Sequence, residues 1–191
     1  MITFIPGYFG WLGNQMFQYA ATFAASKRLG VGCAFPENEP NLFDIFNLSA
    51  SRSKGSTRYI YQEPTFEYSP IPEMDELTLF GYFQSEKYFE DFADDLRKEF
   101  TFKELGESAN ENVVSVHVRR GDYTKLQDHH PLCTVEYYEK AMAMFKDHSF
   151  LVFSNDIEWC KENIKGPRVM YSEEESAAKD LPLLASCDHN I

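Results

Sequence analysis

Apolar and polar residues alternate in regular blocks along the second half of the chain. Short runs rich in Val, Phe and Tyr are followed by longer stretches in which apolar residues recur every three or four positions. Such an order is typical of β-strands that alternate with α-helices, and it predicts a right-handed parallel sheet. We expect strands at 113–118, 150–154 and 168–172, followed by helices at 135–147, 157–164 and 176–187.

The chain also starts with a strand–helix pattern. Met1–Ile5 predicts a strand, and a glycine-containing turn follows at Pro6–Gly13. Asn14 is a good N-cap residue, so we expect a helix that begins near Asn14 and ends before Gly30.

The remainder of the first half is less regular. Five prolines interrupt residues 36–75, where we expect loops and one short helix. A strand at 77–83 follows, and then a helix that begins after Ser85 and extends to Phe100. Gly106–Asn112 has the composition of a linker.

The composition is that of a globular protein with an acidic surface. The 191 residues carry a formal net charge of −12, with 43% hydrophobic and 25% charged residues. The length suits one domain, or one and a fraction. The negative charge argues against a protein that binds nucleic acid or an anionic membrane, so an anionic ligand would need a local basic pocket.

The cysteines and the apolar runs indicate the cellular compartment in which we expect the protein. Cys33, Cys133, Cys160 and Cys187 form neither a zinc motif nor a disulfide framework, which favours reduced thiols. No run is long enough to span a bilayer, and no secretory signal precedes the first strand. We therefore expect a cytoplasmic protein, with peripheral attachment to the cytoplasmic membrane face and homodimerisation left open.

The most informative motif is His117-Val118-Arg119-Arg120-Gly121-Asp122, at the end of a strongly apolar strand. Ligands of open α/β sheets bind at the carboxyl ends of the strands. Two guanidinium groups there suit a diphosphate, because each presents a planar fork of charged donors. We expect one arginine to contact the ligand while the other anchors the loop, with Asp122 holding a guanidinium. A surface cluster of ion pairs is the alternative.

Two further segments at strand ends have both a structural and a functional interpretation. Gly10–Gln15 lies between a strand and a helix, where backbone amides bind phosphate, but an ordinary tight turn also explains its glycines. Its spacing differs from the G-x-G-x-x-G of dinucleotide-binding enzymes. Ser154-Asn155-Asp156 suits helix capping, and the carboxylate also suits the N–H groups of a purine.

No segment has the spacing of a metal site. Asp128-His129-His130 lies in a predicted loop with no partner carboxylate at helical spacing, so we interpret these side chains as solvated. Asp91, Asp94 and Asp95 lie on a helix surface and do not form the D-x-D motif of metal-dependent sugar transferases.

Five separated segments of the chain resemble the α1,2-fucosyltransferases, which belong to a wider superfamily with the α1,6- and protein O-fucosylating enzymes. Order and approximate spacing agree along the whole chain, and the first and third segments are the most specific. The segments are Leu12–Ala20 (LGNQMFQYA), Gly81–Phe89 (GYFQSEKYF), Val114–Tyr123 (VSVHVRRGDY) with His130–Met142 (HPLCTVEYYEKAM), Val152–Asn163 (VFSNDIEWCKEN) and the run from Asp180 (DLPLLASCDHNI).

The resemblance implies an α/β fold that is GT-B-like, with two Rossmann-like halves whose parallel sheets carry helices on both faces. The first would be an acceptor-side domain at 1–105, and the second a truncated GDP-fucose-binding domain at 112–191. It further implies an inverting, metal-independent transfer of fucose from GDP-L-fucose to the 2-hydroxyl of a terminal β-galactoside on a glycan. No cofactor is expected. Negative charge develops on the departing GDP, and without a D-x-D motif a guanidinium is the natural group to stabilise it.

The resemblance also implies roles for individual residues. Arg119 would bind the β-phosphate of GDP, and Arg120 with Asp122 would shape that loop. His117 would lie at the same pocket. Ser154 would contact the donor.

Other donor contacts implied by the resemblance come from both domains. Asp156 would face the guanine, while Gly13, Asn14 and Gln15 would close over the pyrophosphate or the fucose. The general base stays open between His117, Asp122 and Glu86.

The sequence departs from the family pattern at two places. Trp11 stands where the family usually has a small or basic residue. At His189-Asn190-Ile191 the family continues into a further strand and a Ser/Thr-rich segment that completes the donor site. We therefore expect an incomplete C-terminal half and an open donor pocket. An active enzyme, a nucleotide- or glycan-binding remnant without turnover, and a structural remnant are the alternatives.

Overall fold

The computed structural model describes residues 1–5, 10–37, 41–104, 109, 111–173 and 176–191. The chain divides into two compact units, Met1–Glu104 and Leu105–Ile191, here called unit 1 and unit 2. Residues 6–9 of the turn expected at Pro6–Gly13, and residues 106–108 and 110 of the linker expected at Gly106–Asn112, lie outside the described residues.

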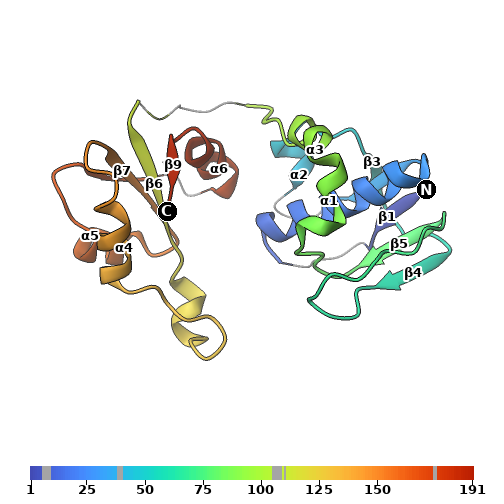
Figure 1. Ribbon diagram of the computed structural model, residues 1–191, viewed down its shortest axis with the longest axis horizontal. Coiled ribbons are helices and arrows are strands. Elements are labelled where there is room, and N and C mark those ends of the chain that lie inside the picture. The colour runs from blue at the N-terminus through green and yellow to red at the C-terminus, as the bar shows by residue number, and fades with distance from the viewer. Residues whose placement is uncertain (6–9, 38–40, 105–108, 110, 174–175) are drawn as a thin grey trace. The chain divides into compact units, whose positions relative to one another are not determined.

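Unit 1 is built on a parallel sheet with β1 at its centre (Figure 1). The strand order is β3-β2-β1-β5-β4, and every pair is parallel. All three residues of β1 are buried, as expected for a strand with neighbours on both sides and helices nearby. The strands are β1 (Ile2–Phe4), β2 (Cys33–Pro36), β3 (Ser51–Ser53), β4 (Tyr59–Gln62) and β5 (Leu77–Phe80).

The long helix α1 (Leu12–Leu29) begins two residues earlier than the sequence suggested. Its N-cap position is Trp11, which makes no side-chain capping bond, so the expectation that Asn14 caps the helix is wrong. The Asn14 side chain instead accepts a hydrogen bond from Gln84 Nε2 at 2.5 Å. The expected end is confirmed, because Gly30 has a left-handed φ of 63° and its N–H bonds the carbonyls of the last turn.

The region 36–75 contains more regular structure than its prolines suggested. The expected short helix is present as α2 (Leu42–Ile45), but β3 and β4 were interpreted as loops, and β2 was not expected either. These strands are short and partly polar, and their pairing partners lie far away in the sequence. Their formation is therefore a tertiary effect that a local pattern does not reveal.

The single helix expected from Ser85 to Phe100 is broken into three short pieces. They are η1 (Glu86–Tyr88), η2 (Glu90–Phe92) and α3 (Ala93–Glu99), and Phe89 between the first two has φ −145° and ψ 5°. This backbone conformation is not helical, so the apolar side chains of the segment pack without a continuous helix.

Unit 2 has the strand–helix alternation that its apolar pattern predicted. The strands are β6 (Val113–Val118), β7 (Ser149–Ser154), β8 (Val169–Tyr171) and β9 (His189–Asn190), all parallel in the order β8-β7-β6-β9. The helices are α4 (Val135–Met142), α5 (Ile157–Asn163) and α6 (Ala177–Ala185), with a 3₁₀ segment η3 (Gly121–Lys125) after β6. An α/β fold with parallel sheets flanked by helices is thereby confirmed.

The topology of unit 2 contains a switch point, where the strand order reverses. The chain runs outward from β6 through β7 to β8 and then returns to the other side of β6 as β9. Figure 1 shows α4 and α5 on one side of this sheet and α6 on the other, as right-handed crossovers in opposite directions require. The strand order therefore reverses between β6 and β9, and open α/β sheets bind ligands at the carboxyl ends of such strands.

Two general properties follow from the described residues. The four cysteines are free thiols. None of the helices in the described part of the chain combines the length and the apolar character needed to cross a bilayer.

Candidate functional site

The site in unit 2 begins where β6 ends. Val116 and Val118 are fully buried, whereas His117 between them is exposed. The backbone N–H of His117 donates to the carbonyl of Ile191 at 2.9 Å, which joins β6 to the segment after β9. The next residues, Arg119 and Arg120, thus leave the sheet at its topological switch point.

Arg119 is the more accessible of the two arginines. Its Nη2 donates to both carboxylate oxygens of Asp122, at 2.8 and 3.1 Å, and its guanidinium carbon lies 5.0 Å from the centre of the Tyr123 ring. Its side chain is 35% exposed. Within the described part of the chain, Nε and Nη1 of Arg119 make no hydrogen bond, so one edge of the fork can take a ligand oxygen.

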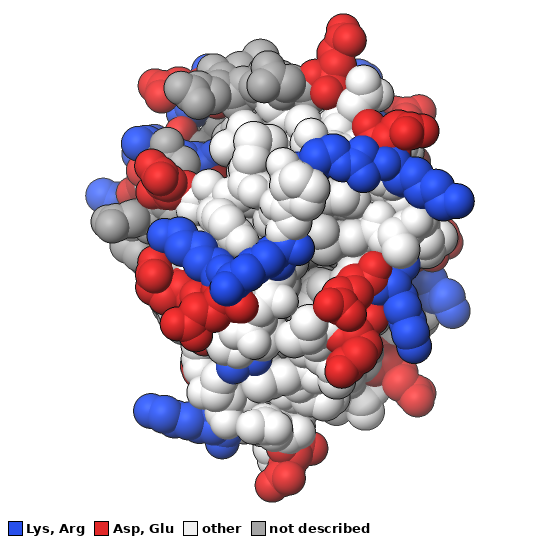
Figure 2. All heavy atoms as spheres, turned by 90° about the vertical axis from the view of Figure 1, so that its left-hand side faces the viewer, with Lys and Arg blue, Asp and Glu red and all other residues white. Residues whose placement is uncertain are grey.

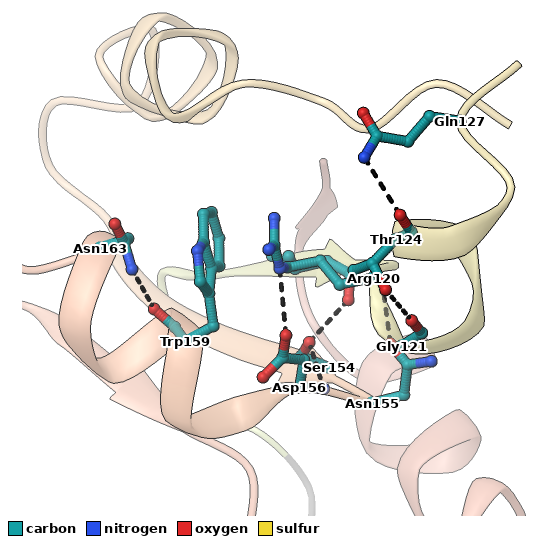
Figure 3. A network of polar contacts seen from close by, with 10 residues as sticks. Arg120, Gly121, Thr124, Gln127, Ser154, Asn155, Asp156, Trp159 and Asn163 are labelled. Carbon is teal, nitrogen blue, oxygen red and sulfur yellow. Dashed lines mark hydrogen bonds and ion pairs between the residues drawn. The ribbon is translucent and has the colours of Figure 1, made fainter.

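Arg120 is anchored to the next strand–helix junction (Figure 3). Its Nε donates to Asp156 Oδ2 at 3.1 Å, its guanidinium carbon lies 3.8 Å from the centre of the Trp159 ring, and its backbone N–H donates to Asn155 Oδ1 at 2.9 Å. Only 17% of its side chain is exposed. The guanidinium is held by a carboxylate and a ring, and the backbone N–H of the same residue is bonded as well, so Arg120 fixes the loop rather than presenting a free charge.

The structure identifies the guanidinium that Asp122 holds. The sequence predicted that Asp122 holds one of the two arginines, and its partner is Arg119, three residues earlier in the same loop. Arg120 pairs instead with Asp156, which comes from the end of β7. One arginine is thus oriented by its own loop and the other by a neighbouring strand.

Ser154-Asn155-Asp156 joins two strand ends into one rigid unit. The Ser154 hydroxyl donates to the carbonyl of Val118 at 2.7 Å and accepts from the Asp156 N–H at 3.0 Å. Asp156 occupies the N-cap position of α5 but makes no side-chain capping bond. Its carboxylate is therefore not used by the helix, and within the described residues its Oδ1 makes no hydrogen bond.

Gly121 is needed for this packing. Its φ is +32°, and a Cβ at this position would lie 2.2 Å from Asn155 Nδ2. Any larger residue would push Asn155 away from the Arg120 N–H that it accepts from. The glycine of the arginine motif thus allows the close approach of the two loops.

The surroundings of His117 favour the neutral form of its ring. Its pKa is lowered from 6.5, first because surrounding protein atoms displace water and then because Arg119 is positively charged, while the charge of Asp180 acts in the opposite sense. At neutral pH the imidazole can therefore accept a proton.

Unit 1 carries the other residues singled out in the sequence. Asn14 is half-buried and bonded to Gln84, and Gly13 is exposed in the first turn of α1. Gln15 is only 1% exposed, so its side chain belongs to the interior of unit 1 in this structure. Glu86, the remaining candidate base, is exposed at the start of η1.

Glu63 is a structural residue that the sequence interpretation missed. Its Oε2 accepts from the backbone N–H groups of Tyr82 and Phe83, at 2.8 and 2.9 Å, and its Oε1 accepts from the Tyr88 hydroxyl at 3.1 Å. A Cβ on Gly81 would lie 2.4 Å from the Cβ of Glu63. The carboxylate thus orders the segment that leads from β5 to Gln84, and no local pattern around Glu63 indicates it.

Trp159 was also missed as a partner of the arginine motif, although it lies within a segment that carries the family resemblance. The helical position of Trp159 places it near Asp156, one turn earlier, and this spacing is the signal that could have revealed the pair. Among the described residues, no group of three or more His, Cys, Asp or Glu side chains is arranged to hold a metal ion.

The charged side chains show no extended field of one sign on the face seen in Figure 2. Lysine and arginine side chains alternate there with aspartate and glutamate around uncharged surface. On this face, positive charge is thus confined to individual side chains with acidic neighbours.

Comparison with known proteins finds relatives that match nearly the whole chain. Rat galactoside alpha-(1,2)-fucosyltransferase 1 is 32% identical over 99% of the chain, which spans 59% of that relative. Rabbit galactoside alpha-(1,2)-fucosyltransferase 2 is 29% identical over 95% of the chain, which spans 61% of it. The alpha-1,2-colitosyltransferase of Escherichia coli is 27% identical over 95% of the chain, and the chain spans 80% of that protein.

The chain therefore covers about three fifths of the length of the mammalian relatives that it matches. No solved structure matches it. The model of glycosyl transferase family 11 matches residues 46–191, which include all of unit 2 and the second half of unit 1. On this match and on the relatives at about 30% identity, the chain belongs to glycosyl transferase family 11.

Proposed function

We propose that this protein transfers L-fucose from GDP-L-fucose to the 2-hydroxyl of a terminal β-galactoside, with inversion and without a metal ion. Membership of the family and the names of its α1,2-fucosyltransferase relatives support the reaction class. The observation that carries the proposal is the position of Arg119 at the switch point of the sheet, with Nε and Nη1 not bonded to any described residue.

In the proposed reaction, the acceptor oxygen attacks the anomeric carbon of fucose as the bond from that carbon to the β-phosphate oxygen breaks. The electron pair of this bond remains on GDP. Arg119 would stabilise the charge that develops on the β-phosphate, because its fork is already oriented by Asp122 and by the Tyr123 ring. Pre-orientation matters since the donors then need no rearrangement as the charge appears.

Arg120, Asp156 and Ser154 would hold this geometry. Arg120 is fixed by Asp156 and Trp159, and Ser154 bridges the ends of β6 and β7. The second carboxylate oxygen of Asp156 would accept from the ring and exocyclic N–H groups of guanine, since its first oxygen binds Arg120.

His117 is the group that we propose as the proton acceptor. The lowered pKa of its ring favours the neutral form, whereas the Asp122 carboxylate is bonded to Arg119. A base must come within about 3 Å of the acceptor hydroxyl, so the assignment requires that the galactoside binds beside the end of β6.

The transfer assay uses GDP-fucose and lactose, with the product linkage identified by NMR. We expect the chain to form an α1,2-linked fucoside in the presence of a chelator. Arg119→Ala should lower turnover by roughly 10²–10³-fold. This is the usual effect of removing one oriented donor that stabilises a developing negative charge. The matched control is Lys125→Ala, which removes a cation from the exposed end of the same loop.

Three outcomes would contradict the proposal. One is the absence of any transfer by a folded chain that binds GDP, which would indicate a nucleotide-binding remnant. Another is wild-type turnover by Arg119→Ala. The third is a preference for an activated colitose over GDP-fucose, which the similarity to the bacterial colitosyltransferase makes a necessary donor to include.

A further inference from the structure

Unit 1 contains a pocket whose lining residues are not part of the candidate site in unit 2. It has a volume of about 220 Å³ and opens beside the carboxyl ends of β4 and β5. Both strands are parallel, so this is the edge of the sheet at which α/β proteins bind ligands. The volume is below the roughly 300–1,000 Å³ of sites for drug-sized molecules, which suits a ligand of one small ring.

Two aromatic rings form one wall of the pocket. Phe66 follows β4 and Tyr82 follows β5, and their ring centres lie 5.7 Å apart with 30° between the planes. The Phe66 side chain is 75% exposed. The two neighbouring rings, inclined by 30°, offer an apolar surface for a ligand ring, and a ligand that covers Phe66 would remove its apolar area from water.

Polar groups lie at the rim of the same pocket. The side-chain amide of Gln62 makes no hydrogen bond within the described part of the chain, and the Thr65 hydroxyl accepts from Glu67 N–H at 3.2 Å but donates to no described residue. An apolar platform flanked by a few donors and acceptors is the usual composition of a small-molecule site. Sugar rings present this combination, with C–H groups on one face and hydroxyls around the edge.

The charge of the pocket excludes other ligand classes. The one acidic lining residue is Glu63, whose carboxylate accepts three hydrogen bonds from the protein and forms no ion pair among the described residues. No Lys or Arg lines the pocket, so a phosphate or carboxylate ligand would be repelled. The side-by-side rings also form a platform rather than the enclosing cage that binds quaternary ammonium groups.

We propose that this pocket binds one neutral pyranose ring of the acceptor glycan, stacked on Phe66 and Tyr82 and hydrogen-bonded by Gln62 and Thr65. The choice of glycan rests on the proposed function, but the recognition of a neutral sugar rests on the pocket itself. Phe66 would then determine acceptor affinity without touching the donor.

The test measures binding of N-acetyllactosamine to the whole chain by saturation-transfer NMR, together with GDP binding by calorimetry. For the wild type we expect a dissociation constant for the glycan on the order of 1 mM. Phe66→Ala should raise it about 10-fold, equivalent to about 1.4 kcal/mol, with GDP affinity unchanged. Because Phe66 is 75% exposed, its truncation leaves the core intact, and circular dichroism verifies this.

The matched control is Tyr59→Ala, which removes a 42% exposed aromatic ring from β4 outside the pocket. The proposal is overturned if the wild type does not bind the glycan, if Phe66→Ala binds it normally, if Tyr59→Ala weakens it equally, or if tetramethylammonium displaces it. Failure of the proposed function is distinguishable, because the chain would then bind the glycan through Phe66 but transfer no fucose to it. Conversely, Phe66→Ala could transfer fucose with an unchanged KM for the acceptor. That result would refute the role of the pocket in acceptor binding, but it would leave the proposed function intact.

Discussion

If Arg120 anchors the loop after β6, its replacement should lower the free energy of unfolding of unit 2. Its guanidinium combines an ion pair to Asp156 with a contact to the Trp159 ring at 3.8 Å, and its side chain is 17% exposed. A partly buried ion pair contributes about 1 kcal/mol, a cation–π contact about 1 kcal/mol, and the buried methylene groups somewhat less. Arg120→Ala should therefore lower the free energy of unfolding of unit 2 by about 2–3 kcal/mol.

The two tryptophans make the assay specific to one unit. Trp11 lies in unit 1 and Trp159 in unit 2, so a Trp11→Phe background leaves a single tryptophan, and this tryptophan contacts Arg120. Urea unfolding followed by this fluorescence reports the transition around α5 even if the two units unfold separately. With a slope of about 2 kcal/mol per molar urea, Arg120→Ala should move the midpoint down by about 1–1.5 M.

Two variants separate the contributions. Arg120→Lys keeps the charge beside Asp156 but loses the planar stacking on Trp159, so it should lose about half of the stabilisation. Lys161→Ala is the matched control, because it removes an exposed ion pair with Glu158 on the same helix and should cost less than about 0.5 kcal/mol. The reasoning is refuted if Arg120→Ala unfolds within 0.5 kcal/mol of the wild type or if Arg120→Lys is as damaging as Arg120→Ala.

Three further predictions concern activity, packing and pH. Arg119→Lys should recover little of the turnover lost in Arg119→Ala, because a point charge does not reproduce the fork, and a kcat near that of the wild type would contradict this. Tyr19→Phe should destabilise unit 1 by about 1–3 kcal/mol in chemical denaturation, since the buried Tyr19 hydroxyl donates to Glu99 at 2.5 Å and accepts from the Ala50 N–H; an unchanged midpoint would count against this network. Because folding lowers the pKa of His117 from 6.5, the unfolded state binds more protons at mildly acidic pH, so the free energy of unfolding should fall as pH drops below about 7 and level off below the folded pKa. His117→Gln should reduce this fall between pH 7 and pH 5, and an identical pH dependence of the variant would show that the histidine does not cause it.

The sequence alone predicted the fold class and the strand that carries the candidate site, for a physical reason that is visible at β6. Val113–Val118 was expected as a strand and is observed with the same bounds, because a strand buried on both faces must be apolar along its length. The helix end at Gly30 was equally readable, since a left-handed cap favours glycine. Both features depend on local chemistry.

The edge strands of the sheet in unit 1 could not be predicted from local sequence in the same way. β3 is Ser-Arg-Ser, and it exists because it pairs with β2, while β4 pairs with β5 across fifteen or more residues of chain. The partners of Glu63 are likewise spread between Tyr82 and Tyr88. Such pairings depend on which segments the fold brings together, and the local sequence has no pattern that reports it.

By itself, the sequence determined that this is an α/β protein with an arginine motif at the end of a buried strand. The spacing of apolar residues and the charge of arginine can be read locally, because neither depends on distant parts of the chain. Only the tertiary structure decided which arginine is anchored and which keeps donors for a ligand. Asp122 lies close to both arginines in sequence, yet Arg120 pairs with Asp156, 36 residues further along, because the parallel strands β6 and β7 end side by side. The division of roles between two identical side chains is thus a consequence of sheet topology.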